Sequence, residues 1–417
     1  MAAAPGAWTG RAAPQPGRLP GTGETGPCLA WTPLPAPAEL LEEMPLPART
    51  AAAVEGARAA IRAVLTGTGD RLLVVAGPCA VHDPAAAVDY ARRLVALQHQ
   101  YAGDLLIVMR VYFEKPRTVG GWKGLVNDPD MDGGHDLARG LRLTRQLLMD
   151  VADTGLPAGC EWLDPMMPGY LADAVSWGAI GARTAESQVH RQLASGLPMP
   201  VGFKNGTDGD VQVAVDGCRA AAAGHAFFGF TPGGGTAKLI SAGNPDCHVI
   251  LRGGRQGPNY RRRDVAAALD LVTATGLPRR VMVDASHGNS GKDHRRQPGV
   301  AADIAAQIAA GEPGLAGVML ESFLIEGRQE PGDPARLAYG KSVVDACIDI
   351  GTTAEILGQL AAAVRERRDV LRATRSPARP GIPRQACPGA VTPAGPPPDH
   401  GHSARTRPGA RVPAAQI

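Results

Sequence analysis

Short apolar runs with β propensity recur along the middle of the chain, and longer segments with helical periodicity separate them. The β-prone runs are Leu72 to Ala76, Leu105 to Tyr112, Ala158 to Leu163, Ala179 to Ala182, Val201 to Lys204, His248 to Leu251, Val281 to Ala285 and Gly317 to Leu320. Nearly continuous hydrophobicity in short runs is typical of parallel strands that are covered on both faces. The intervening segments carry apolar residues at spacings of three and four, as in Ala85 to Leu97, Leu137 to Ala152, Val211 to Ala223, Asp264 to Thr275 and Gly299 to Ala309. About eight such repeats predict an α/β fold of the (β/α)8, or TIM, barrel type.

One stretch interrupts this rhythm. Residues Ala226 to Ala242 read as two short strands around a Gly-rich turn, so we expect a β-hairpin inserted before the sixth barrel strand. The glycines do not form a nucleotide-binding P-loop, because Gly235 is followed by Thr236 and Ala237 rather than by Lys and Ser or Thr.

The two ends of the chain differ from its middle. Residues 1–27 and 376–417 are rich in Pro, Gly, Ala and Arg without periodicity, and we expect both to be disordered tails. Between them we expect an N-terminal extension at 28–70, with a possible role in regulation or oligomer formation, and a catalytic barrel at 71–370.

Composition narrows the function classes. The formal net charge of +3 comes from the Arg-rich C-terminal tail, so the rest of the chain does not have the basic balance of a nucleic-acid binder. The seven cysteines form no C-x-x-C pair, as expected of a reduced intracellular protein. An apolar run of about 18 residues, which a membrane span needs, is lacking in the sequence. We therefore expect a cytoplasmic protein that binds neither nucleic acid nor a membrane.

Charged residues collect where the predicted strands end, which is where such barrels place their active sites. The cations at these positions are Arg110, Lys115, Arg117, Arg183, Lys204 and Arg252. Their convergence on one pocket would be repulsive without a polyanionic ligand, so phosphorylated substrates are indicated. The segment Lys115, Pro116, Arg117 and Thr118 joins one strand to a flexible glycine pair and suits an anion. A solvated basic loop is the alternative interpretation.

Metal-ligating residue types occur at the same strand ends. Cys79, His287, Glu321 and Asp345 offer one sulfur, one imidazole and two carboxylates. This mixed set suits a divalent transition ion such as Mn, Fe, Co or Zn better than Mg. The alternative is that Cys79 is a buried structural thiol, since the four residues are not closely spaced.

Several motifs carry a resemblance to a known family. They are G-P-C-A-V-H-D (77–83), K-P-R-T (115–118), G-W-K-G-L (121–125), G-A-R-T-A-E-S-Q (181–188), G-F-K-N-G-T-D-G (202–209), L-R-G-G (251–254), S-H-G-N-S (286–290) and V-M-L-E-S (318–322). In order and spacing the chain resembles the class I 3-deoxy-D-arabino-heptulosonate 7-phosphate (DAHP) synthases from Pro33 to Arg365. The resemblance implies a barrel enzyme of the shikimate pathway that condenses phosphoenolpyruvate with erythrose 4-phosphate and releases phosphate.

The resemblance also implies roles for individual residues. The family's metal set falls on Cys79, His287, Glu321 and Asp345. Its phosphoenolpyruvate contacts fall on Arg110, Lys115, Glu161, Arg183, Lys204 and Arg252, and its erythrose 4-phosphate contacts on Lys115, Pro116, Arg117 and Thr118. We expect Lys115, Glu161 and His287 to be the catalytic residues.

The resemblance further implies a homo-oligomer, a dimer or a tetramer. Feedback inhibition by an aromatic amino acid is a further implication, at a site built partly from residues 30–65. Two other functions stay open from the sequence. One is the related octulosonate 8-phosphate synthase, which uses a five-carbon sugar phosphate, although K-P-R-T favours the four-carbon partner. The other is a non-catalytic paralogue that serves as a regulatory subunit.

Overall fold

The computed structural model describes residues 31–117 and 119–375. The tails expected at 1–27 and 376–417 lie outside these residues. Among the described helices, none combines the length and the apolar character that a membrane crossing requires.

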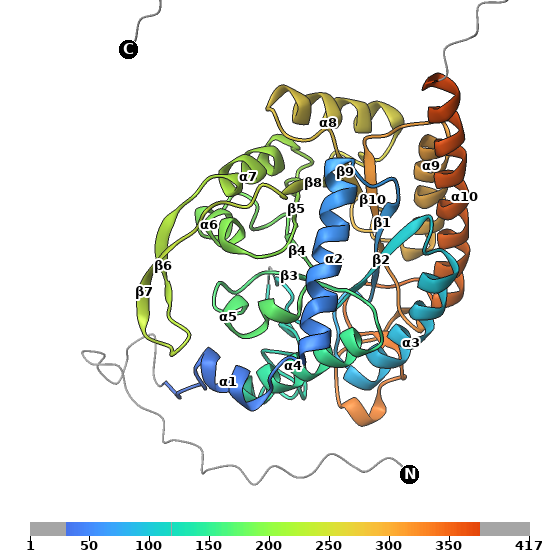
Figure 1. Cartoon of the computed structure of the whole chain (residues 1–417). Helices are drawn as coiled ribbons and strands as arrows, with labels where there is room; N and C mark the ends of the chain where they lie inside the picture. Colours follow the sequence, from blue (N-terminus) through green and yellow to red (C-terminus); the bar gives the residue numbers. More distant parts are fainter. Residues whose placement is uncertain (1–30, 118, 376–417) are drawn as a thin grey trace, which may run out of the picture. The chain divides into compact units, whose positions relative to one another are not determined.

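Within the described residues, eight parallel strands close a barrel (Figure 1). They are β1 (Leu72–Gly77), β2 (Leu105–Arg110), β3 (Ala158–Glu161), β4 (Trp177–Ile180), β5 (Val201–Lys204), β8 (His248–Leu251), β9 (Val281–Asp284) and β10 (Leu315–Glu321). Every residue of these strands is buried, because one face points into the barrel and the other packs under helices. The predicted α/β barrel is confirmed.

Two strand boundaries differ from the prediction for identifiable reasons. The run Leu105 to Tyr112 was expected to be all strand, but β2 ends at Arg110 although Val111 and Tyr112 stay buried. Because these two residues are as buried as the strand itself, the apolar pattern of the sequence does not show where the hydrogen bonds between the strands end. The fourth strand begins at Trp177, two residues before the predicted start, and contains Gly178. A Cβ at Gly178 would lie 2.7 Å from Trp162 Nε1, so this glycine makes room for an aromatic ring and does not mark a turn.

Helices surround the barrel in the expected alternation. They are α3 (Pro84–Gln100), α4 (Leu137–Asp153), α5 (Pro168–Leu171) with the short η1 (Ala172–Ala174), α6 (Gln188–Gly196), α7 (Gln212–Ala222), α8 (Arg262–Ala274), α9 (Gln297–Ala309) and α10 (Ile350–Arg375). Asp83 caps α3 by accepting hydrogen bonds from the backbone N–H groups of Ala85 and Ala86 at 2.9 and 3.1 Å. A short η2 (His294–Arg296) leads directly into α9.

Among the described residues, two helices precede the barrel, α1 (Pro37–Glu43) and α2 (Ala48–Thr66), and Figure 1 shows α2 in front of the strands. The end of α2 supplies Ile61, Val64 and Leu65 to the same buried cluster as Leu73 and Leu106, which lie near the starts of β1 and β2. The α2 helix therefore closes the amino end of the barrel, which leaves the carboxyl end open for a site. The division at residue 70 stays a prediction, because elements on both sides of it share one core.

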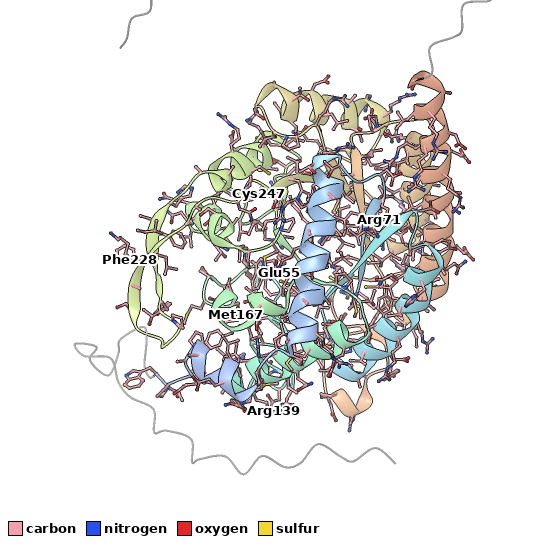
Figure 2. The ribbon with its side chains drawn as sticks, in the orientation of Figure 1. Glu55, Arg71, Arg139, Met167, Phe228 and Cys247 are labelled. Atoms are coloured by element: carbon pink, nitrogen blue, oxygen red, sulfur yellow. The ribbon has the colours of Figure 1, made fainter. Side chains whose placement is uncertain are left out.

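Two small sheets in the described part of the chain lie outside the barrel. The hairpin β6 (Ala226–Phe230) and β7 (Thr236–Ile240) is inserted between β5 and β8, directly before the sixth barrel strand as predicted. Figure 2 labels Phe228 on this hairpin, at the edge of the view, and the side chain is 98% exposed. After β10, the strands β11 (Ile325–Arg328) and β12 (Lys341–Ser342), with η3 (Pro334–Arg336) between them, lead towards Asp345 and α10.

Candidate active site

A cavity of about 280 Å³ opens where the barrel strands end, large enough for a small phosphorylated molecule. Its walls come from the ends of β3 and β5 and from the loops after β2, β4, β8 and β9. The cations that line it are Lys115, Arg117, Arg183, Lys204, Arg252 and Lys292, and the carboxylates are Glu161 and Asp345. Six cations against two carboxylates make this a site for an anion with more than one charge.

Three of the expected metal ligands meet at one side of this cavity. Cys79 follows β1, Glu321 ends β10, and Asp345 lies between β12 and α10. One ligand atom from each lies within 4.8 Å of the others. Donors at about 2.0–2.6 Å from a shared ion would have this spacing, so the three can hold one cation.

His287, the fourth expected ligand, adjoins this group without being part of it. Its Nε2 lies 3.6 Å from Glu321 Oε1, while its Nδ1 lies 2.9 Å from Asp284 Oδ2. Ser286 Oγ lies 2.7 Å from the same Nδ1 and donates its own proton to Asp284 Oδ1 at 2.6 Å. Because the hydroxyl oxygen and the carboxylate both accept from Nδ1–H, Nε2 in the neutral ring keeps its lone pair towards Glu321. The backbone of His287 has φ +51°, which is uncommon for a residue other than glycine.

The protonation preferences of the group also suit a cation. Burial, and then the charge of Glu321, raise the pKa of the Cys79 thiol well above its usual range. Burial opposes ionisation of Glu321 too, but His287, Arg110 and Lys115 lower its pKa to about 2. A thiol in this setting ionises when a divalent cation binds it, because the cation stabilises the thiolate. The donor set therefore fits the metal that the sequence indicated.

Arg110 lies beneath the site and does not line the cavity. Its side chain is fully buried and donates to the carbonyl oxygens of Pro78 and Cys79 at 3.1 and 3.3 Å. It also donates to Glu321 Oε1 at 3.0 Å, and the ring of Tyr112 covers its guanidinium group at 3.6 Å. In this structure Arg110 holds the Cys79 loop and Glu321 together from below.

Lys115 and Lys204 are buried lysines whose amino groups are held by acceptors on opposite sides of the site. Lys115 Nζ donates to the carbonyl oxygen of Cys79 at 3.1 Å, which places its charge beside the metal group. Lys204 Nζ donates to Asp284 Oδ2 at 2.8 Å, and the side chains of Lys204 and Asp284 are nearly inaccessible to solvent. Burial alone would raise the pKa of Asp284, but Lys204 and His287 lower it well below its usual range. Asp284 therefore connects a cavity lysine to His287.

The remaining expected substrate contacts lie on the rim. Arg183 and Arg252 line the cavity from the loops after β4 and β8, and Pro116 and Arg117 line it from the loop after β2. Thr118, the other residue expected on the sugar phosphate side, lies outside the described residues. Glu161 is 5% exposed and packs against Gly181, where a Cβ would lie 2.1 Å from its carboxylate oxygen. Glycine at position 181 leaves room for the Glu161 carboxylate in its present position, and a larger residue would displace it.

Several residues of the site were missed by the sequence analysis. Asp284 is the most important, and its signal was visible, because it is the one charged residue in the apolar run Val281 to Ala285. Asn205 is another: its Oδ1 accepts from the backbone N–H of Arg252 at 2.8 Å, and its amide donates to the carbonyl oxygen of Gly253 at 3.0 Å. Nothing in the sequence singled out Lys292, which lines the cavity from the loop after β9.

Glu114, directly before Lys115, is a buried carboxyl group that the sequence analysis also missed. Burial raises its pKa to about 8, although the backbone N–H of Asp164 donates to it at 3.4 Å. Since the pKa in the folded state exceeds that in the unfolded chain, stability falls as pH rises from about 4.5 to about 8. We expect Glu114→Gln to raise the free energy of unfolding at pH 8 by at least about 1 kcal/mol and to flatten this part of the profile. Urea denaturation across this pH range measures both effects.

The matched control for Glu114 is Glu366→Gln, an exposed position on α10. It is expected to leave the pH profile of stability unchanged. A profile for Glu114→Gln that runs parallel to the wild type would show that the Glu114 carboxyl group is ionised in the folded protein.

Comparisons with known proteins identify the family of the chain. The model of the DAHP synthetase I family matches residues 47–358. The chain belongs to this family. It is 53% identical over 348 residues to a phospho-2-dehydro-3-deoxyheptonate aldolase of Corynebacterium glutamicum, covering 82% of this chain and 94% of that one. It is 55% identical over 334 residues to the Phe-sensitive enzyme of that name from Escherichia coli, covering 80% and 95%.

The fold of this DAHP synthetase I family member is also similar to a solved structure. The phospho-2-dehydro-3-deoxyheptonate aldolase of Francisella tularensis aligns with a TM-score of 0.79 and 46% identity, covering 81% of this chain and 98% of that one. Family membership thus covers the whole barrel, including every strand end that lines the cavity.

Proposed function

We infer that the chain is a DAHP synthase, a transferase that condenses phosphoenolpyruvate with erythrose 4-phosphate. The methylene carbon of phosphoenolpyruvate bonds to the aldehyde carbon of the sugar. Water then adds to the carbon that carries the phosphoryl group, and inorganic phosphate leaves. The product is a seven-carbon sugar acid phosphate, which starts the shikimate pathway to chorismate and the aromatic amino acids.

The observation that carries this function is the pairing of a cation-rich cavity with a Cys, Glu and Asp group in one barrel mouth. Lys115 belongs to both, since it lines the cavity and its Nζ lies 3.1 Å from the Cys79 carbonyl oxygen. The two substrates each carry a phosphate, and one also carries an aldehyde. The site therefore offers cations for the phosphates and a place for a metal beside the aldehyde.

We assign the metal to Cys79, His287, Glu321 and Asp345. When bound, a divalent ion acts as a Lewis acid that polarises the aldehyde oxygen. The sulfur and imidazole favour Mn, Fe, Co or Zn over Mg. Arg110 keeps Glu321 ionised and fixed, and Asp284 sets the tautomer of His287.

The phosphoenolpyruvate contacts are assigned to Lys115, Glu161, Arg183, Lys204 and Arg252, with Arg110 beneath them. Lysines 115 and 204 are held in place by acceptors, so they are preorganised for an anion before it binds. The guanidinium groups of Arg183 and Arg252 offer forked donors that match a phosphate or carboxylate. Pro116, Arg117 and Thr118 are assigned to the phosphate of erythrose 4-phosphate.

Proton transfer during the water step is assigned to side chains beside the cavity. Glu161 is nearly buried, lines the cavity and lies among cations, which suits a carboxylate that accepts a proton from the attacking water. Lys115 carries a charge beside the metal group and can stabilise the developing alkoxide.

The substrate assignment predicts a specific assay result. We expect phosphate release and loss of phosphoenolpyruvate when erythrose 4-phosphate is the acceptor, and at least about a hundredfold lower kcat/KM with a five-carbon aldose phosphate. A colorimetric phosphate assay with each aldose phosphate measures this preference. Turnover only with the five-carbon sugar would make the chain an octulosonate 8-phosphate synthase, and turnover with neither would favour a non-catalytic regulatory paralogue.

We also propose that the protein is a homo-oligomer, a dimer or a tetramer. Phe228, Phe230 and Ile240 share one face of the hairpin, because Ala226 pairs with Ile240 and alternate residues point to the same side. Phe228 is 98% exposed and Ile240 76%, an unusual amount of apolar surface for a face that stays in water.

We expect Phe228→Ser to shift the protein towards smaller species, because it removes apolar area from this face. Light scattering coupled to size-exclusion chromatography measures the mass. Val189→Ser on α6, where the side chain is 53% exposed, is the control and should leave the mass unchanged. A wild-type protein of monomer mass would refute the proposal.

Feedback inhibition by an aromatic amino acid is a further part of the proposal. Relatives are named Phe-sensitive, Trp-sensitive and Tyr-sensitive enzymes. Adding phenylalanine, tyrosine and tryptophan separately to the same assay identifies the inhibitor of this chain.

Because phosphorylated sugars do not cross membranes unaided, we propose that the enzyme acts in the cytoplasm.

A further inference from the structure

A second hollow adjoins the active-site cavity. It has a volume of about 1090 Å³ and shares Arg183, Thr207, Arg252, His287 and Lys292 with the cavity. Its outer part is lined by Tyr260 and by Arg255, Arg261, Arg295 and Arg296. We call this outer part the entrance groove. Since the shared residues connect the two hollows, an ion in the groove reaches the site without leaving the protein surface.

The charge of the entrance groove is of one sign. Among the described residues, the second hollow as a whole, including the shared Lys292, is lined by neither Asp nor Glu. Asp293 partly offsets two of these charges, since it lies 3.0 Å from Arg295 and 3.8 Å from Arg296. Within the described part of the chain, Arg255 and Arg261 have no ion-pair partner. Clustered cations without counter-charges attract small anions over about one Debye length, roughly 8–10 Å at moderate salt.

The groove has a rigid floor made of backbone. A Cβ at Gly254 would lie 2.3 Å from the backbone of Gly209, and a Cβ at Gly253 would lie 2.5 Å from that of Gly288. The loop after β8 thus packs backbone to backbone against the loops after β5 and β9. Asn259 fixes it further, because its Oδ1 accepts from the Gly253 N–H at 2.7 Å. Arg255 is therefore carried by a loop whose backbone is fixed beside the site.

We propose that the entrance groove collects the phosphorylated substrates from solution and directs them into the active site. The proposal rests on the inferred synthase activity, since it assumes that the anions consumed in the cavity are phosphate esters. In the groove the cations act at a distance on ions that have not yet reached the site. They raise the local concentration of substrate and the rate of productive encounter, and they do not touch the reacting atoms.

Arg261 and Arg262 provide a matched pair for the test. Both are exposed and adjacent at the start of α8, but only Arg261 lines the groove. We expect Arg261→Gln to lower kcat/KM for phosphoenolpyruvate about threefold at low ionic strength, with kcat unchanged. The difference in kcat/KM between Arg261→Gln and the wild type should vanish as added salt screens the charge. The kcat/KM of Arg261→Gln should therefore depend less steeply on salt than that of the wild type. Arg262→Gln removes the same charge from outside the groove and should lower kcat/KM clearly less than Arg261→Gln does.

Each possible outcome decides the question. If kcat/KM depends equally on salt in Arg261→Gln and Arg262→Gln, the proposed role of the entrance groove is wrong. A fall in kcat with unchanged KM in Arg261→Gln would also contradict it. If the wild type shows no turnover, the inferred synthase activity fails separately. Calorimetric binding of inorganic phosphate then tests the groove without turnover: weaker binding by Arg261→Gln than by Arg262→Gln supports it, and equal binding refutes it.

Discussion

Replacing Cys79 by serine is expected to reduce metal affinity and turnover together, each by at least about a hundredfold. The serine hydroxyl does not ionise at neutral pH, so the group would lose its thiolate while Glu321 and Asp345 remain. Metal content after dialysis, measured by atomic emission, gives the first effect, and phosphate release at saturating substrates gives the second. Wild-type protein treated with excess chelator should lose activity in the same way.

Cys218→Ser is the matched control, because both substitutions replace a fully buried thiol by a hydroxyl, whereas only Cys79 lies beside Glu321 and Asp345. Each costs about 1–3 kcal/mol of stability, so a difference in activity between the two cannot come from folding. After chelation, Mn or another first-row ion should restore the wild type, and Mg should do so poorly because it prefers oxygen ligands. Full activity of Cys79→Ser, or of metal-free protein, would show that the assigned ligand set is wrong.

Asp284→Asn is expected to impair both stability and catalysis. The substitution leaves Lys204, which is 4% exposed, as a buried cation without its carboxylate partner at 2.8 Å. Breaking a buried pair in this way costs about 3–5 kcal/mol of unfolding free energy. The amide can also present its NH2 group to His287 Nδ1, which would favour the tautomer with Nε2 protonated and so oppose metal binding.

Urea denaturation and metal content together test the role of Asp284. Turnover should fall at least about a hundredfold even at temperatures where the variant is folded. Asp270→Asn is the control: this side chain is 78% exposed and lies 3.8 Å from Arg279, so its loss should cost little. Wild-type metal affinity in folded Asp284→Asn would mean that Asp284 supports Lys204 alone and does not orient His287.

Local patterns in the chain were enough to predict the barrel and its open end. The eight apolar runs became the eight barrel strands, and two of them, Val201–Lys204 and His248–Leu251, match residue for residue. This works because a strand buried on both faces must be apolar throughout, whatever its neighbours are. Because parallel strands all end at the same rim, Cys79, Glu161, Lys204 and Glu321 could be assigned to one site before any contact was known.

The sequence could not determine the partner of each charge or the direction of each side chain. Arg110 and Lys115 look alike as cations near one strand end, yet Arg110 is enclosed beneath the metal group and Lys115 lines the cavity. Lys204 pairs with Asp284 across 80 residues of chain, and the folded strand order, with β8 between β5 and β9, brings the two side chains together. The entrance groove likewise needs three loops packed backbone to backbone. Burial and periodicity are local properties that the sequence carries directly, whereas pairing and direction depend on strand register and loop packing, which exist only once the chain has folded.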